Sequence, residues 1–137
     1  MDLGALAFVL LLGLIWIAYG ILTRKPSPYD DRACMGASWK KAFPNAESDR
    51  IRSFLACLVE GMELPQAKLS FHPNDKAIDI YRSLYGGRTP LSDECECEDF
   101  LKNIEDEFGV SAESIVDNVW TDEHVTLRVI FAFVESR

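Results

Sequence analysis

The residues from Leu3 to Leu22 form one uninterrupted apolar stretch without a charged side chain. A helix rises about 1.5 Å per residue, so a helix of this length crosses a hydrocarbon layer of roughly 30 Å. A cleaved signal peptide is the competing interpretation, and it requires a positively charged start, a shorter apolar stretch and a small-residue cleavage site. Asp2 is the only charged residue before the apolar stretch, and no such cleavage site follows it. We therefore expect residues 1–23 to be a single-pass transmembrane anchor that binds the membrane through residues 3–22.

Basic residues follow the apolar stretch and do not precede it. Arg24 and Lys25 come directly after it, and Lys40 and Lys41 lie further along. Positive charge beside a span marks its cytoplasmic side, so we expect the C-terminal domain in the cytoplasm, anchored in a bacterial inner membrane. An aromatic residue next to lysines is suited to the headgroup layer. We expect Trp39 to lie there together with these four basic residues.

Charge divides the rest of the chain into two parts. Residues 24–42 hold 5 basic and 2 acidic residues, a net charge of +3, whereas residues 43–137 hold 9 basic and 19 acidic residues, a net charge of −10. Nucleic acid is an unsuitable ligand for the acidic part, because phosphate binding depends on clustered Lys and Arg. The Pro26-Ser27-Pro28 stretch marks residues 24–45 as a linker. Residues 46–137 suffice for one small acidic domain with a single core.

Apolar residues recur with helical periodicity in two segments. The first runs from Ser48 to Met62, after a capping candidate at Asn45 or Ser48. The second ends at Gly109 and has Asp93 as its capping candidate. The two stripes are formed by Ile51, Phe54, Leu55, Leu58, Val59 and Met62, and by Cys97, Phe100, Leu101, Ile104 and Phe108. Both stripes are expected to face the same core.

Three shorter segments complete the prediction. Residues 74–85 suit a short helix stopped by Gly86-Gly87, although Ile78 and Ile80 alternate as in a strand. Serine and threonine caps predict helices from Ser111 to Val119 and after Thr126. The expected fold is mainly α, a transmembrane helix followed by a small helical bundle. The alternative is an α+β fold with a short strand pair near 68–82 or 125–134, because the second run is rich in β-branched and aromatic residues.

The chain has four cysteines, which are Cys34, Cys57, Cys95 and Cys97. A cytoplasmic location is reducing, so free thiols are expected. Side chains two residues apart on a helix point nearly 200° from each other, so Cys95 and Cys97 do not suit a metal site. We expect Cys97 in the core, Cys95 outside it, and Cys57 half exposed beside the stripe of its helix.

Motifs that carry catalysis are absent from the sequence. It contains no phosphate-cradling glycine loop, no Walker motif and no HExxH. Its many carboxylates are expected on a solvated helix, where nothing raises the pKa of one above another. We therefore expect no enzyme activity and no cofactor.

The expected order of elements is a long helix, a long connection, an acidic helix, a short helix and a closing helix. This order resembles that of an acyl carrier protein. Residues 93–95 (Asp-Glu-Cys) and 104–110 (Ile-Glu-Asp-Glu-Phe-Gly-Val) resemble the acidic second helix of that family, and residues 125–134 resemble its final helix. The resemblance covers residues 46–137 and is clearest over 91–134. It implies a small helical bundle.

One departure from the family concerns its cofactor. Carriers attach phosphopantetheine to a serine at the start of the second helix, and Glu94 occupies that position here. A carboxylate cannot replace the hydroxyl nucleophile, and Ser92 precedes the neighbouring aspartate in the wrong order. The chain is therefore similar to the carrier-like domains of enterobacterial type that lack this serine, which implies that no phosphopantetheine is bound.

The resemblance also implies a docking surface, because basic patches on partner enzymes recognise carriers through the acidic helix. The simpler interpretation is a solvated helix face that maintains solubility. We expect a non-catalytic module that docks a basic cytoplasmic protein. The alternatives are an immunity protein that neutralises a toxin and a small structural subunit of a membrane complex. The expected partner-binding residues are Asp93, Glu94, Glu96, Glu98, Asp99, Glu105, Asp106 and Glu107.

Overall fold

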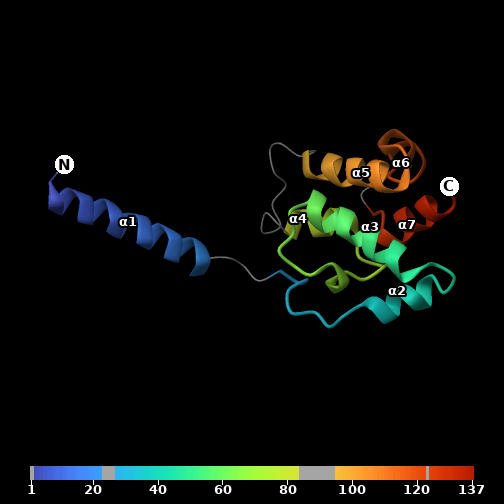
Figure 1. Cartoon of the computed structure of the whole chain (residues 1–137), viewed down its shortest axis with the longest axis horizontal. Helices are drawn as coiled ribbons and strands as arrows, with labels where there is room; N and C mark the ends of the chain where they lie inside the picture. The colour runs from blue at the N-terminus through green and yellow to red at the C-terminus, as the bar shows by residue number, and fades with distance from the viewer. Residues whose placement is uncertain (1, 23–26, 84–94, 123) are drawn as a thin grey trace.

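The computed structural model describes residues 2–22, 27–83, 95–122 and 124–137, with residues 95–97 described by their backbone alone. The described chain is mainly helical (Figure 1), as the sequence predicted. Its elements are α1 (Leu3–Leu22), α2 (Gly36–Ala42), α3 (Ser48–Gly61), the short 3-10 helix η1 (Lys68–Ser70), α4 (Ala77–Ser83), α5 (Cys95–Phe108), α6 (Ala112–Asn118) and α7 (Leu127–Glu135).

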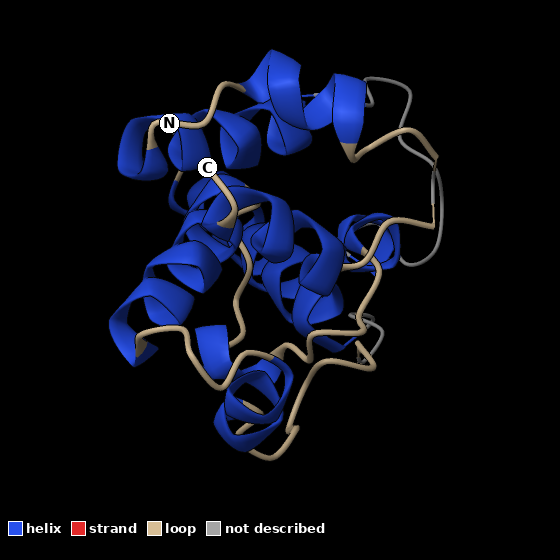
Figure 2. Cartoon of the chain, turned by 90° about the vertical axis from the view of Figure 1, so that its right-hand side faces the viewer, coloured by secondary structure: helices blue, strands red, loops and turns tan. Residues whose placement is uncertain are grey.

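The strand pair of the α+β alternative is not formed. Residues 77–83 are helical, and so are residues 127–135. Between these two segments, a single isolated antiparallel bridge joins Lys76 to Thr126. The described residues contain no longer strand, as Figure 2 also shows.

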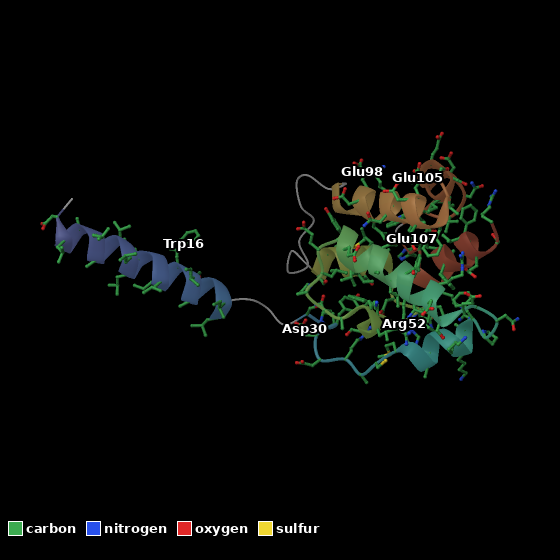
Figure 3. All side chains as sticks on the ribbon, in the orientation of Figure 1. Trp16, Asp30, Arg52, Glu98, Glu105 and Glu107 are labelled. Carbon is green, nitrogen blue, oxygen red and sulfur yellow. The ribbon has the colours of Figure 1, made fainter. Side chains whose placement is uncertain are left out.

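Helix α1 is long and apolar enough to cross a membrane. None of its residues is buried. Large apolar side chains such as Leu22 and Trp16, the latter labelled in Figure 3, are therefore largely exposed. This pattern suits a lipid environment, because a helix that is apolar all round must be covered by a core or by a membrane.

Helix α3 lies at the centre of the domain, with α5 and α6 on one side and α2 on the other (Figure 1). The helices α3 and α5 are antiparallel, since Gly61 at the end of α3 adjoins Phe100 near the start of α5. At the opposite ends, the Arg50 guanidinium lies 5.0 Å from the centre of the Phe108 ring. The core is formed where these two helices meet α7.

The predicted apolar stripes are confirmed where the side chains are described, except that Val59 and Phe108 are only half-buried at the edge of the core. Buried residues of α3 and its C-cap include Ile51, Phe54, Leu55, Leu58 and Met62, and those of α5 include Phe100, Leu101 and Ile104. The predictions for Asp93 and for the side chain of Cys97 lie outside the described part of the chain. The expected cap of α3 is wrong, because its N-cap is Glu47, whose side chain makes no capping hydrogen bond.

The later helix boundaries were predicted correctly. Gly109 follows α5 with a φ of +72°, a conformation that glycine adopts at the end of a helix without a steric cost. The Ser111 hydroxyl accepts a hydrogen bond from the Ser114 N–H at 3.2 Å and caps α6. The Thr126 hydroxyl caps α7 in the same way by accepting from the Val129 N–H at 3.4 Å.

The expected linker is wrong over residues 27–43, which pack against the domain and are called the strap below. Tyr29 and Trp39 are both buried. The Trp39 indole N–H donates to the carbonyl oxygen of Phe71 at 2.8 Å. The folded domain therefore begins near Tyr29 and not at residue 46. Trp39 does not lie in the headgroup layer, because α2 inserts its ring into the core.

Polar contacts fix the strap to the connection between α3 and α4. Arg32 donates to both carboxylate oxygens of Asp75, at 2.6 and 3.2 Å, and also to the carbonyl of Ser70 at 3.3 Å. The Met35 N–H donates to the carbonyl of Leu69 at 2.7 Å. A two-pronged arginine–carboxylate pair fixes geometry more strongly than a single hydrogen bond does. The strap and the connection therefore form one unit.

The backbones of α3 and α5 touch at Gly61. A Cβ atom at this position would lie 2.6 Å from both the Cα and the N atoms of Phe100. Such a contact is with backbone, so it cannot be relieved by rotating a side chain. The position therefore requires glycine.

We expect Gly61→Ala to lower the free energy of unfolding by about 1–3 kcal/mol, because the added methyl group forces the two helices apart. Alanine is otherwise favoured over glycine inside a helix, so a loss of stability reports the clash. The matched control is Gly36→Ala, where a Cβ would meet only the Cys34 Sγ at 3.5 Å. The measurement is urea unfolding of the full chain in detergent, followed by tryptophan fluorescence. Equal stability of the two variants would contradict the close approach.

Candidate protein-docking surface

The solvent side of α5 carries a group of acidic side chains. Phe100 and Ile104 direct one side of this helix into the core. At about 100° per residue, four exposed carboxylates then share the opposite side and surround Lys102. This acidic face consists of Glu98, Asp99, Glu105 and Asp106. Figure 3 shows Glu98 and Glu105 along the outer side of α5.

Lys102 neutralises little of the acidic face. Its Nζ lies 3.7 Å from Asp106 Oδ1, and both side chains are more than half exposed. An exposed pair of this kind contributes roughly 0.3–0.5 kcal/mol. With four carboxylates and one ammonium group, the acidic face keeps a net charge of −3.

Glu105 also has a structural contact. Its Oε2 accepts a hydrogen bond from the Ala112 N–H at 3.2 Å, across the turn at Gly109. The N–H groups in the first turn of a helix have no partner within the helix, so this carboxylate helps to satisfy the start of α6. A change at Glu105 would therefore disturb both the fold and the surface.

Glu107 is exposed but is not part of the acidic face. In Figure 3 it lies toward α3, away from Glu98 and Glu105. Asp93 and Glu94 lie outside the described residues, as does the side chain of Glu96. The structure thus groups four of the predicted partner-binding residues and separates Glu107 from them.

Helix α6 adds acidic residues that the sequence prediction missed. Glu113 and Asp117 are exposed, whereas Ile115 is fully buried. Their spacing of four residues on the side opposite Ile115 is the signal that identifies them as a second exposed acidic pair. They extend the negative charge beyond α5.

The negative charge of the domain is concentrated in this region. Residues 95–122 hold 9 acidic residues and 1 basic residue, whereas residues 27–83 hold 8 of each. The domain is therefore electrically one-sided. The excess of negative charge over these two ranges lies on α5, on α6 and on the turns beside them.

The predicted membrane-interface residues are only partly placed. Lys40 and Lys41 are exposed on α2, and the Lys40 Nζ donates to the carbonyl of Ala46 at 2.7 Å. Arg24 and Lys25 lie outside the described residues. The two lysines share α2 with the buried Trp39, so they are part of the folded domain.

The described cysteines differ in environment. Cys34 is exposed and Cys57 is buried, and both are free thiols. The prediction that Cys57 is half exposed is wrong, because α5 covers the side of α3 that carries this residue. Burial raises the pKa of the Cys57 thiol to about 11, and the negative charges of Glu107 and Glu60 add to the effect. Among the described residues, no group of three His, Cys, Asp or Glu side chains could hold a metal ion.

We expect iodoacetamide to modify Cys57 much more slowly than Cys34 at pH 8, because the thiolate is the reactive form and Cys57 stays protonated there. Its rate should rise roughly tenfold per pH unit below its pKa. Glu107→Gln should accelerate the reaction, since it removes a charge that raises the pKa. Peptide mass spectrometry of the folded chain measures these rates. Similar rates at Cys34 and Cys57 would contradict the burial.

Comparisons with known proteins give no relative of this chain: no protein-family model, no curated protein and no solved structure matches it.

Proposed function

We propose that this chain is a membrane-anchored, non-catalytic interaction module that docks a basic protein partner through the acidic face of α5. The observation that carries the proposal is the exposure of four carboxylates around a single lysine. Clustered exposed charge steers a complementary partner during diffusional encounter and fixes its orientation. The partner is expected to carry a patch of Lys and Arg.

Helix stability accounts for only part of the negative charge of α5. Acidic residues near the start of a helix complement its dipole, which explains Glu98 and Asp99. Asp106 of the acidic face lies in the last turn of α5, which contains no basic residue. Carboxylates in that turn oppose the dipole, at a cost of roughly 0.3–1 kcal/mol each. Binding of a partner would explain why a carboxylate occupies this turn although it does not stabilise the helix.

The location is part of the proposal. Arg24 and Lys25 follow α1 directly, and this supports a single-pass protein of a bacterial inner membrane with its domain in the cytoplasm. Confinement to a membrane raises the effective concentration of the domain near a partner held at the same membrane. A weak electrostatic contact then suffices for docking.

The resemblance to acyl carrier proteins is also retained as a proposal. The helices α3, α5, α6 and α7 follow one another as long, acidic, short and closing helices, with α4 inside the long connection. With Glu94 at the serine position, such a domain would keep the docking mode of a carrier without its prosthetic group.

The test is affinity capture from membranes of the native host with the acidic face neutralised by Glu98→Gln, Asp99→Asn and Asp106→Asn. Glu105 is left unchanged because it contacts α6. We expect a basic protein that binds the wild-type chain at about 50 mM salt to be largely lost with this variant, because steering and docking weaken together. Quantitative mass spectrometry measures the recovery.

The matched control removes three exposed carboxylates elsewhere by Glu47→Gln, Asp49→Asn and Asp79→Asn. This control should retain the partner, because it changes the net charge equally but leaves α5 intact. Equal recovery with both variants would refute docking through the acidic face. If the partner is instead recovered through α1 alone, whatever the charge of α5, the result would support the structural-subunit alternative.

A further inference from the structure

The strap limits the distance between the domain and the membrane. Leu22 ends α1, and Ser27 is the next described residue. A chain extends at most about 3.6 Å per residue, so these two residues lie within roughly 18 Å of each other in any conformation of residues 23–26. The domain is therefore held close to the surface that α1 enters.

The first residues of the strap are themselves fixed to the domain. The Ser27 N–H donates to Asp30 Oδ2 at 2.9 Å, and Asp30 Oδ1 accepts from the Gln66 side chain at 2.8 Å. The buried Tyr29 ring lies 5.5 Å from the Phe71 ring, measured between centroids. The membrane anchor is thus attached to a defined side of the domain and not through a long flexible linker.

This attachment side is opposite to the acidic face. The strap and η1 lie on one side of α3, and α5 and α6 lie on the other (Figure 1). In Figure 3, Asp30 of the strap is on the side of the domain opposite to Glu98 and Glu105. Met35 N–H bonds the strap to Leu69 of η1, while Gly61 places α5 against α3. The thickness of α3 separates the two sides.

The charge distribution of the domain favours the same orientation at the membrane as the short attachment does. Residues 27–83, which include the attachment side, hold equal numbers of basic and acidic residues, whereas residues 95–122 hold 9 acidic residues and 1 basic residue. An anionic lipid surface repels the second region and has little effect on the first. The repulsion acts within a Debye length, about 10 Å at 0.1 M salt, so it is felt by a domain tethered this closely.

We propose that the domain rests with its strap, α2 and η1 toward the lipid headgroups and directs the acidic face of α5 into the aqueous phase. If α5 is the docking surface, as the proposed function states, this orientation also identifies the kind of partner. It is a basic protein peripheral to the same membrane, which approaches α5 from the aqueous side.

The orientation is tested on the full chain in vesicles of phosphatidylcholine and phosphatidylglycerol that contain a nickel-chelating lipid. A nitroxide label is attached through Lys68→Cys on η1 or Lys102→Cys on the acidic face, in a background of Cys34→Ser, Cys95→Ser and Cys97→Ser. Both lysines are exposed, so the two variants are matched in charge and in expected effect on folding. Buried Cys57 is retained. Electron paramagnetic resonance measures relaxation of each label by headgroup nickel.

We expect relaxation of the label at position 68 to be several-fold stronger than at position 102. Equal relaxation, or stronger relaxation at position 102, would overturn the proposed orientation. A second pair, Lys41→Cys on α2 and Glu113→Cys on α6, should repeat the difference. Nickel lipid is present in both leaflets, so the result does not depend on the direction of insertion.

The vesicles contain no partner protein, so the result for the orientation is independent of whether the proposed docking function is correct. A domain oriented as expected that captures no basic protein would contradict only the docking function. Capture through α5 by a domain that lies the other way would contradict only the orientation.

Discussion

Trp39 connects the segment that follows the membrane anchor to the core of the domain. Its indole N–H donates to the buried Phe71 carbonyl, and its ring lies 6.0 and 5.7 Å from the rings of Phe54 and Phe131. A buried carbonyl that loses its donor costs roughly 1–3 kcal/mol, and an aromatic side chain removed from a core costs about 3–5 kcal/mol. The strap therefore cannot detach while the core stays intact. Together with the Arg32–Asp75 pair, this side chain attaches the anchor to a defined side of the domain.

Local signals were sufficient to predict most helices, because each signal acts over a few residues. The Ser111 and Thr126 caps and the stop at Gly109 are examples. The strap was missed because α2 has only 7 residues, too few to show a helical period, and its lysines resemble those of a linker. Cys57 was misplaced because α3 is covered on two sides, so its buried surface is wider than one apolar stripe.

The acidic face could be predicted only in part from the sequence. The charge of α5 is evident from its composition, but composition does not show which carboxylates share a surface. The structure places Glu107 toward α3, apart from Glu98 and Glu105, and gives Glu105 a contact with Ala112. The opposition between the strap and the acidic face depends on how α3 packs between them, which is a tertiary arrangement without a local sequence signal.

Hydrogen–deuterium exchange of the full chain in detergent tests the integration of the strap most directly. The Trp39 and Phe43 amides donate to carbonyls inside the strap, at 3.2 and 2.9 Å, and can exchange only when it opens. The account predicts protection of peptides covering residues 36–43 close to that of α3. Exchange of those peptides at the rate of an unfolded chain, while α3 stays protected, would contradict it.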